Sequence, residues 1–411
     1  MERKIQQIEC LLDVCSLTEE QCREKLFSVK WGEKACCPKC GNTDRISYLK
    51  TRNVYKCLEC SKQFSLVKGT LFENSNMPLK KWFAAIYLMS TEVTGISSVQ
   101  MAKHLKIEQN TAWYIMQKLR FAMSGCDSIG LLGGIVEIDE TFLGAVKTKD
   151  KRLAFKVYLK RKKRIQMEAE GLTERDNRLK RLEMKTVRKG NKKKARPTLK
   201  AIFNDLPYIS RELLRDWEVR NIMYQPLHYK KNVVGIVERN IFDSNGKLLK
   251  LGRLRLTKMG RHKGDLTRVN VQPFIEENVS RSSHIMTDDN RIYRKLPEIF
   301  QQHSVIKHSQ SGVNQQFAKH ADGEVTTNYI ENVWKHLKKV ENGTYIHYSW
   351  KYTQCYLDEF TFRFNRRESK PLVLFQDLFS LTIGKTISRK EMVGIQGKYY
   401  YYPKGAEEMN Y

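Results

Sequence analysis

Two patterns of apolar positions alternate along the chain, one with the period of an α-helix and one with the period of a β-strand. Between residues 76 and 125 the helical pattern recurs in three runs, which are separated by Gly95 and by a short turn at Lys106. Ser97 or Ser98 can cap the second run, and the turn leads into a longer third run. Two helices joined by a tight turn predict a helix-turn-helix-like DNA-binding region, although a plain helical spacer is the alternative.

From residue 130 onward, short strand-like runs are interspersed with helical ones. Strands are expected at residues 135–138, 232–242, 247–258, 284–286 and 303–309, and helices at residues 271–280 and 326–340. A further helix or turn, which contains Tyr293, follows the fourth strand. This order is that of a ribonuclease H-like fold, in which acidic residues meet at one edge of a central mixed sheet. The pattern predicts a multidomain α/β protein with a ribonuclease H-like domain over residues 130–367.

Acidic side chains stand where two of these strands end and on the last of these helices. Asp139 and Glu140 end the first strand, and only one of them should reach a shared site because side chains alternate along a strand. Asp288 or Asp289 ends the fourth strand, and Glu331 lies on the polar face of the helix. Each acid alone would more often be a cap or a surface charge. As an ordered set, they can hold Mg²⁺ or Mn²⁺ ions for phosphoryl transfer.

Four cysteines form two closely spaced pairs. Cys37 and Cys40 make one CxxC knuckle, and Cys57 and Cys60 make a second one after an intervening stretch that reads as two short strands. Two such knuckles joined by a hairpin supply the tetrahedral sulfur ligands that zinc prefers, whereas buried thiols or a redox pair are the alternatives. Cys36 could replace its neighbour, but the CPxC pattern favours Cys37.

The chain is strongly basic, with 74 Lys and Arg against 45 Asp and Glu and a formal net charge of +29. This excess favours a polyanionic partner, most often nucleic acid. From Lys147 to Lys200 there are 22 Lys and Arg against 6 Asp and Glu. We interpret residues 147–230 as a basic insertion that follows phosphates, while a solvated charged face is the alternative.

Composition also limits the class of protein. A hydrophobic content of 41% is enough for real cores and excludes a wholly disordered chain. The absence of a long apolar run argues against a membrane span, and the first residues do not resemble a signal peptide. We therefore expect a cytoplasmic protein in a reducing compartment, where thiols can bind metal.

The C-terminal quarter predicts one more helix. Residues 356–364 have an amphipathic pattern that would pack on the sheet. Arg363, Arg366 and Arg367 fall on other faces, where we expect them to approach DNA. Residues 368–411 are expected to form a C-terminal tail.

Segments that hold these residues resemble insertion-sequence transposases of the Merlin-related group. They include LTEEQCREKLFSVKWGEKACCPKCG, VEIDETFLG, MTDDNRIY and TTNYIENVWKHLKK, in the family's order between residues 17 and 367. The family joins a zinc ribbon, here within residues 1–72, to a helix-turn-helix-like region and a DDE catalytic domain. The resemblance implies a structural Zn²⁺ ion and catalytic Mg²⁺ or Mn²⁺.

The resemblance also selects site residues. It makes Asp139, Asp288 and Glu331 the catalytic acids, and it places His308 and Asn328 near the site. Two features depart from the family. Thr326 stands where the family usually has His, and the segment between the first two strands is longer than usual.

The implied function is metal-dependent cleavage of transposon-end DNA, followed by transfer of the 3′ hydroxyl into target DNA. The implied partners are double-stranded DNA, both terminal inverted repeats and target, and a second copy of the chain, because two ends must be paired in a homodimer or higher oligomer. Such a protein would associate with the prokaryotic nucleoid. A zinc-ribbon DNA-binding regulator with an inactive domain and a structure-directed nuclease are the alternatives.

Overall fold

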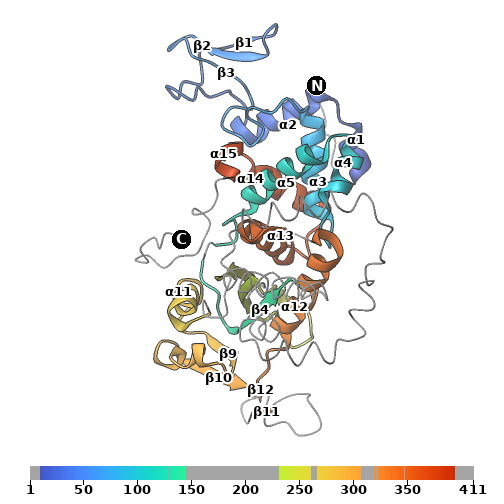
Figure 1. The fold of residues 1–411 in the computed structure, drawn as a ribbon. Helices are drawn as coiled ribbons and strands as arrows, with labels where there is room; N and C mark the ends of the chain where they lie inside the picture. The colour runs from blue at the N-terminus through green and yellow to red at the C-terminus, as the bar shows by residue number, and fades with distance from the viewer. Residues whose placement is uncertain are drawn as a thin grey trace, which may run out of the picture. The chain divides into compact units, whose positions relative to one another are not determined.

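The computed structural model describes residues 10–128, 130–144, 231–260, 266–306, 319–320, 323–346 and 348–393. The predictions for His308 and for the basic insertion at residues 147–230 lie outside these residues. Figure 1 shows the described elements, which form a small sheet, a helical region and a larger mixed sheet. No helix in the described ranges is both long and apolar enough to cross a membrane.

A short N-terminal helical pair precedes the small sheet. Its elements are α1 (Leu11–Ser16), α2 (Glu19–Trp31), β1 (Ile46–Leu49), β2 (Val54–Cys57) and β3 (Gln63–Phe64). The hydroxyl of Thr18 caps α2 by accepting a hydrogen bond from the main-chain amide of Gln21, and the main-chain amide of Thr18 donates to the Gln21 side chain. The three strands pair antiparallel in chain order, so the predicted hairpin between the cysteine pairs is present.

The helical region contains the predicted helix-turn-helix pattern. Its helices are α3 (Leu79–Thr91), α4 (Ser98–Leu105), α5 (Gln109–Met123), α14 (Pro371–Leu381) and α15 (Arg389–Val393). Ser97, one of two candidates, caps α4, and Lys106 ends it in the left-handed conformation at φ 48°. The turn to α5 is therefore as short as the sequence indicates.

The segment expected to be a C-terminal tail contributes to the core of this region. Phe375 and Phe379 of α14 pack against Phe83 of α3, with ring centroids 5.7 and 4.8 Å apart. These aromatic side chains are buried, so the tail assignment needs correction as far as residue 393. The sequence of α14 is apolar over two turns, but only its long-range partner α3 makes it part of a domain.

The larger sheet has the strand order and directions expected of a ribonuclease H-like domain. Its strands are β4 (Ile135–Leu143), β5 (Lys231–Glu238), β8 (Leu254–Lys258), β9 (His284–Asp288) and β10 (Gln302–Ile306). The order across the sheet is β10-β9-β4-β5-β8, with β4, β5 and β8 antiparallel and β9 and β10 parallel to β4. The prediction of a multidomain α/β protein with a mixed sheet is confirmed.

Helices cover both faces of the sheet. They are α11 (Arg268–Asn278), α12 (Asn328–Val340) and α13 (Thr353–Asn365). On one face, α11 packs on Val136 and Ile138 of β4, and on the other face α12 and α13 pack on Val233 and Val237 of β5. Two small hairpins complete the described strands, β6 (Ile241–Phe242) with β7 (Leu248–Lys250) and β11 (Lys319–His320) with β12 (Gly323–Glu324).

The arginines of α13 are engaged within the fold. Arg363 pairs with the buried carboxylate of Glu359. Arg366 donates to Asp127 at 2.9 Å, and Arg367 donates to the main-chain oxygen of Gly252 at 3.1 Å. The prediction that these arginines approach DNA is wrong for Arg363, which is buried, and stays a prediction for Arg366 and Arg367, which are half-buried.

A buried ion pair joins the helical region to the sheet domain. Arg120 of α5 is 1% exposed and donates to Glu359 of α13 at 2.6 Å. The same helix α13 packs on β8 through Leu357 and Phe360. Buried charges are stable only when paired and hydrogen-bonded, so this pair gives α5 a fixed contact with the domain that holds the acids.

Candidate active site and zinc centre

The four predicted cysteines converge between the two knuckles. The sulfur atoms of Cys37, Cys40, Cys57 and Cys60 all lie within 4.8 Å of one another, and the Cys37–Cys60 and Cys40–Cys57 pairs are 3.6 Å apart. Cys36 lies outside this group, and its sulfur is 3.5 Å from the main-chain oxygen of Gly41. Four sulfurs at this spacing fit a structural zinc ion.

Two of the three predicted acids meet where strand β9 ends. Strand β4 continues past Asp139 to Leu143, so the expectation that Asp139 and Glu140 end the first strand is wrong. Asp139 lies on β4 and Asp288 is the last residue of β9, and their carboxylates come together with that of Glu140 within 4.8 Å. The parallel pairing of the two strands sets Ile135 level with His284. Counting on from that pair brings Asp139 level with Asp288. The register of the sheet therefore places these acids side by side.

The structure corrects the expectation that only one acid of the Asp139–Glu140 pair reaches the site. The two side chains do leave opposite faces of β4, since Asp139 contacts α12 whereas Glu140 contacts the turn after β9. However, β4 and β9 are paired only as far as Glu137 and Met286. Beyond that point no ladder joins β4 to β9, so the longer Glu140 side chain reaches the carboxylates of Asp139 and Asp288.

Helix α12 touches the acidic cluster through a tryptophan. The indole nitrogen of Trp334 donates to Asp139 at 2.8 Å. Its ring passes over Gly235, which pairs with Asp139 on β5, and a β-carbon at Gly235 would lie 2.4 Å from that ring. A glycine on β5 therefore lets α12 approach the sheet closely enough to contact the first acid.

The third predicted acid, Glu331, lies on α12 one turn before Trp334 and outside the carboxylate cluster. It accepts a 3.5 Å hydrogen bond from the hydroxyl of Thr327. Asn328 begins the helix and is exposed. The predicted apolar stripe of α12 is buried, which confirms that Glu331 belongs to the opposite, polar side of the helix.

Glu140 also connects the cluster to the turn that follows β9. This turn begins with η3 (Arg291–Tyr293), and the hydroxyl of Tyr293 donates to Glu140 at 2.6 Å. The side chain of Asn290 donates to the other Glu140 oxygen at 2.5 Å, while its main-chain amide donates to Asp288 at 3.2 Å. Glu140 is thus hydrogen-bonded through both oxygens to the segment that carries the second acid.

We expect Glu140→Gln to lower metal-dependent DNA cleavage about 10- to 100-fold, the effect typical of residues that orient metal ligands. The amide would set an NH₂ group against the donors of Asn290 and Tyr293, and the turn after Asp288 would shift. A single-turnover cleavage assay measures the rate. A loss as complete as that of Asp288→Asn would instead make Glu140 a ligand itself.

The electrostatics of the cluster fit a divalent cation. Burial, followed by the nearby carboxylates of Glu140 and Asp288, raises the pKa of Asp139 to about 7. Burial also raises the pKa of Glu140. Half-buried carboxylates this close together repel one another, and a bound cation would remove this repulsion and favour their ionised forms. Carboxylate oxygens are also the ligands that Mg²⁺ and Mn²⁺ prefer.

The crowding of these carboxylates predicts that the protein loses stability as the pH rises when a chelator removes metal ions. On folding, the pKa of Asp139 rises from an ordinary value of 3.8 to about 7. Between these two pH values the folded protein holds a proton that the unfolded chain has lost, so the wild type loses stability as the pH rises to about 7. Asp139→Asn should therefore become more stable than the wild type toward pH 8, with a melting temperature about 2–4 °C higher. Thermal unfolding in EDTA between pH 5 and pH 8 measures the difference. A difference that is constant or shrinks with rising pH would contradict it.

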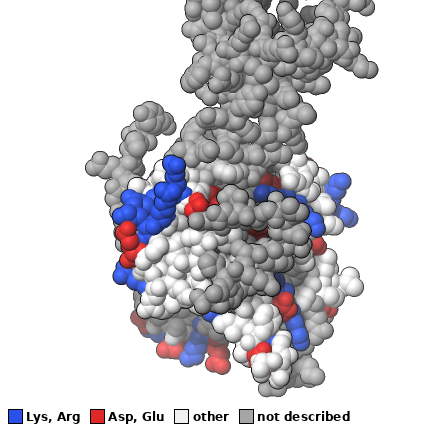
Figure 2. All heavy atoms as spheres, turned by 90° about the horizontal axis from the view of Figure 1, so that it is seen from below, with Lys and Arg blue, Asp and Glu red and all other residues white. Residues whose placement is uncertain are grey.

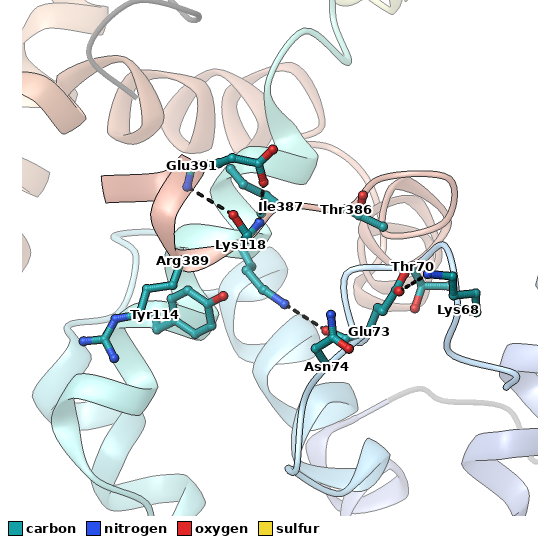
Figure 3. A pocket seen from close by; sticks show the side chains of 11 residues that line it. Lys68, Thr70, Glu73, Asn74, Tyr114, Lys118, Thr386, Ile387, Arg389 and Glu391 are labelled. Atoms are coloured by element: carbon teal, nitrogen blue, oxygen red, sulfur yellow. Dashed lines mark hydrogen bonds and ion pairs between the residues drawn. The ribbon is translucent and has the colours of Figure 1, made fainter. Parts of the chain in front are cut away.

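A separate pocket of about 320 Å³ lies in the helical region and is shown in Figure 3. Lys118 of α5 points into it and donates to the main-chain oxygen of Leu71 at 2.8 Å. Glu73 accepts from Lys68 and from the amide of Gly69. These groups bind one another and main-chain atoms, so we interpret the pocket as part of the packing between α5 and the C-terminal segment rather than as a ligand site.

Sequence reasoning missed the residues that hold the clustered acids in place. Glu140, Asn290 and Tyr293 stand within the DET and DDNRIY segments, and Trp334 follows Glu331 by three positions. Their nearness in sequence to the acids was the available signal. Glu137 and Arg239, which support α12, carried no local signal because their contacts form only when β4, β5 and α12 pack together.

Comparisons with known proteins agree with this architecture. Residues 218–365 match the family model described as the ISXO2-like transposase domain, and residues 17–63 match the transposase zinc-ribbon domain. Asp288 and Glu331 lie inside the first match, and Asp139 precedes it.

A stretch of 131 residues is 29% identical to an uncharacterized protein in transposable element ISH50 of Halobacterium salinarum. That stretch covers 31% of this chain and 43% of the relative, so the match spans less than half of the relative's length. No solved structure matches the chain.

The four-cysteine cluster lies within the segment that is similar to the transposase zinc-ribbon domain, and β5, β8, β9 and β10 of the mixed sheet lie within the segment that is similar to the ISXO2-like transposase domain. Over these two segments the chain is similar to an ISXO2-like transposase domain and to a transposase zinc ribbon.

Proposed function

We propose that the chain is a DDE transposase that cleaves transposon-end DNA and transfers the resulting 3′ hydroxyl into target DNA. One observation carries this proposal: Asp139 of β4 and Asp288 at the end of β9 meet beside the helix that bears Glu331. The transposase family matches support the same class of reaction. Because the matched relative is covered for less than half its length, the activity of the whole protein remains our proposal.

Each acid has a distinct place in the proposed site. Asp139 and Asp288 would hold Mg²⁺ or Mn²⁺ between β4 and β9, and Glu331 would complete the oxygen ligands from α12. Divalent ions in such sites activate water and stabilise charge on the leaving oxygen. Trp334 would keep the Asp139 carboxylate oriented. Asn328 is exposed at the start of α12, where it would be accessible to DNA.

DNA recognition is assigned to the zinc ribbon and to α4 and α5. The turn between α4 and α5 leaves Gln109 at the exposed start of α5, where recognition helices contact base edges. Among the described residues on the face drawn in Figure 2, basic and acidic side chains are interspersed. We propose the terminal inverted repeats and target DNA as partners, with a homodimer or higher oligomer to pair two ends, in the prokaryotic cytoplasm.

A strand-transfer assay tests the proposal and separates it from a nuclease and from a regulator. The substrates are labelled duplexes that end in the element's terminal repeat, either intact or already cut to expose the 3′ hydroxyl. With Mg²⁺ or Mn²⁺, we expect cleavage of the first and joining of the second to plasmid DNA. Cleavage without joining would identify a nuclease, and metal-independent binding without either reaction would identify a regulator.

A further inference from the structure

The start of α12 is capped from outside the helix. The side chain of its N-cap residue, Thr327, accepts no hydrogen bond from the main-chain amides of the first turn. Instead, the amide of Ile330 donates to the carboxylate of Glu137 on β4 at 2.9 Å. Glu137 is fully buried, at 0% exposure. The first turn of a helix leaves amide groups without partners and attracts negative charge, so a buried carboxylate fits there electrostatically.

Arg239 joins the same carboxylate to the segment that leads into α12. Its Nε donates to Glu137 at 2.6 Å. Its Nη2 donates to the main-chain oxygen of Thr326 at 2.9 Å and to the Thr326 hydroxyl at 2.8 Å. The main-chain amide of Arg239 donates to the oxygen of Ile135 at 2.9 Å, so the arginine is itself anchored on β4.

These hydrogen bonds connect the neighbourhoods of two proposed ligands, Asp139 on β4 and Glu331 on α12. Glu137 lies two residues before Asp139, so both side chains leave β4 on the face that α12 covers. Ile330 immediately precedes Glu331. The contact between Glu137 and Ile330 therefore fixes the position of Glu331 relative to the strand that carries Asp139.

We propose that Glu137 and Arg239 are positioning residues for Glu331. The inference deepens the proposed function and rests on it, because Glu331 needs a position only if it is a metal ligand. Neither residue contacts the reacting atoms in this role. They hold the start of α12 so that the carboxylate on its first turn can join those of β4 and β9.

The test compares Glu137→Gln with Glu238→Gln in the full-length protein. Glu238 is a matched control because it is 1% exposed on the neighbouring strand, and its carboxylate contacts Arg253, Lys250 and the amide of Gly133, none of which belongs to α12. Both variants lose a buried carboxylate that is paired with an arginine, so general destabilisation should be similar. Thr326→Val, which removes one acceptor of Arg239, is a milder second variant.

Two readouts are independent of DNA cleavage. Hydrogen–deuterium exchange reports the first turn of α12, and electron paramagnetic resonance reports Mn²⁺ binding. In Glu137→Gln we expect faster exchange at residues 328–331 and Mn²⁺ affinity about 10- to 100-fold weaker. Glu238→Gln should change neither by more than about twofold, and Thr326→Val should show a smaller change in the same direction.

The outcomes separate this inference from the proposed function. If the wild type binds Mn²⁺ and Glu137→Gln binds it as tightly as Glu238→Gln does, the positioning role is wrong and the metal site stands. The same holds if exchange of α12 is unchanged. If the wild type itself binds no Mn²⁺, the proposed metal site fails, and the positioning role fails with it.

Discussion

Asp139→Asn, Asp288→Asn and Glu331→Gln are each expected to reduce end cleavage and strand joining at least ~1000-fold, a loss of roughly 4 kcal/mol of transition-state stabilisation. Each substitution replaces a charged oxygen ligand by a neutral amide of nearly the same shape. The chain should therefore fold and bind end DNA as the wild type does. Single-turnover cleavage and joining with Mg²⁺, alongside a gel-shift assay in Ca²⁺, measure the two properties separately.

Asp289→Asn is the matched control for this set, because it directly follows Asp288 but lies outside the carboxylate cluster. It should keep a rate within a few-fold of the wild type. Wild-type rates in any one of the three variants would remove that acid from the proposed site, and a large loss in Asp289→Asn would show that the second ligand is assigned to the wrong aspartate.

Cys57→Ser is expected to abolish zinc binding and unfold the ribbon between residues 34 and 64. Structural zinc contributes on the order of 10 kcal/mol to small domains of this kind, far more than the few buried side chains around the four sulfurs. Zinc content measured by atomic absorption should fall to near zero, and binding to terminal-repeat DNA should weaken by at least ~10-fold. The helical region and the larger sheet have their own cores, so they should stay folded.

Cys36→Ser provides the control for the zinc centre. Cys36 is adjacent to Cys37, but its sulfur contacts main-chain oxygens and lies outside the four-sulfur group. It should retain full zinc content and normal DNA binding. If both cysteine variants lose zinc equally, Cys36 takes part in ligation, and the assignment of Cys37 alone must be revised.

The fold could be predicted from local signals where the sequence makes each element distinct. The CxxC pairs and the intervening hairpin predict the ribbon. The alternation of short strands and helices predicts the order of these elements along the chain. Ser97 and Lys106 mark the ends of α4 by their capping behaviour. Such signals depend on a few neighbouring residues, so they survive without knowledge of the tertiary structure.

Long-range packing accounts for what could not be predicted. Helix α14 looked like part of a tail because its partner α3 lies nearly 300 positions away in sequence. The alternation rule correctly separated Asp139 from Glu140, but it could not show that the ladder between β4 and β9 ends before them. Likewise, nothing near Glu137 in sequence indicates that it caps a helix 193 residues later.

The assignment of the third acid is the central claim, because the structure groups Asp139, Glu140 and Asp288 while the proposed function requires Glu331. A crystal structure with end DNA and Mn²⁺, using anomalous scattering to locate the metal, tests it most directly. The account predicts metal bound to Asp139, Asp288 and Glu331, with Glu140 still hydrogen-bonded to Tyr293. Metal held by Asp139, Glu140 and Asp288, with Glu331 turned away, would contradict it.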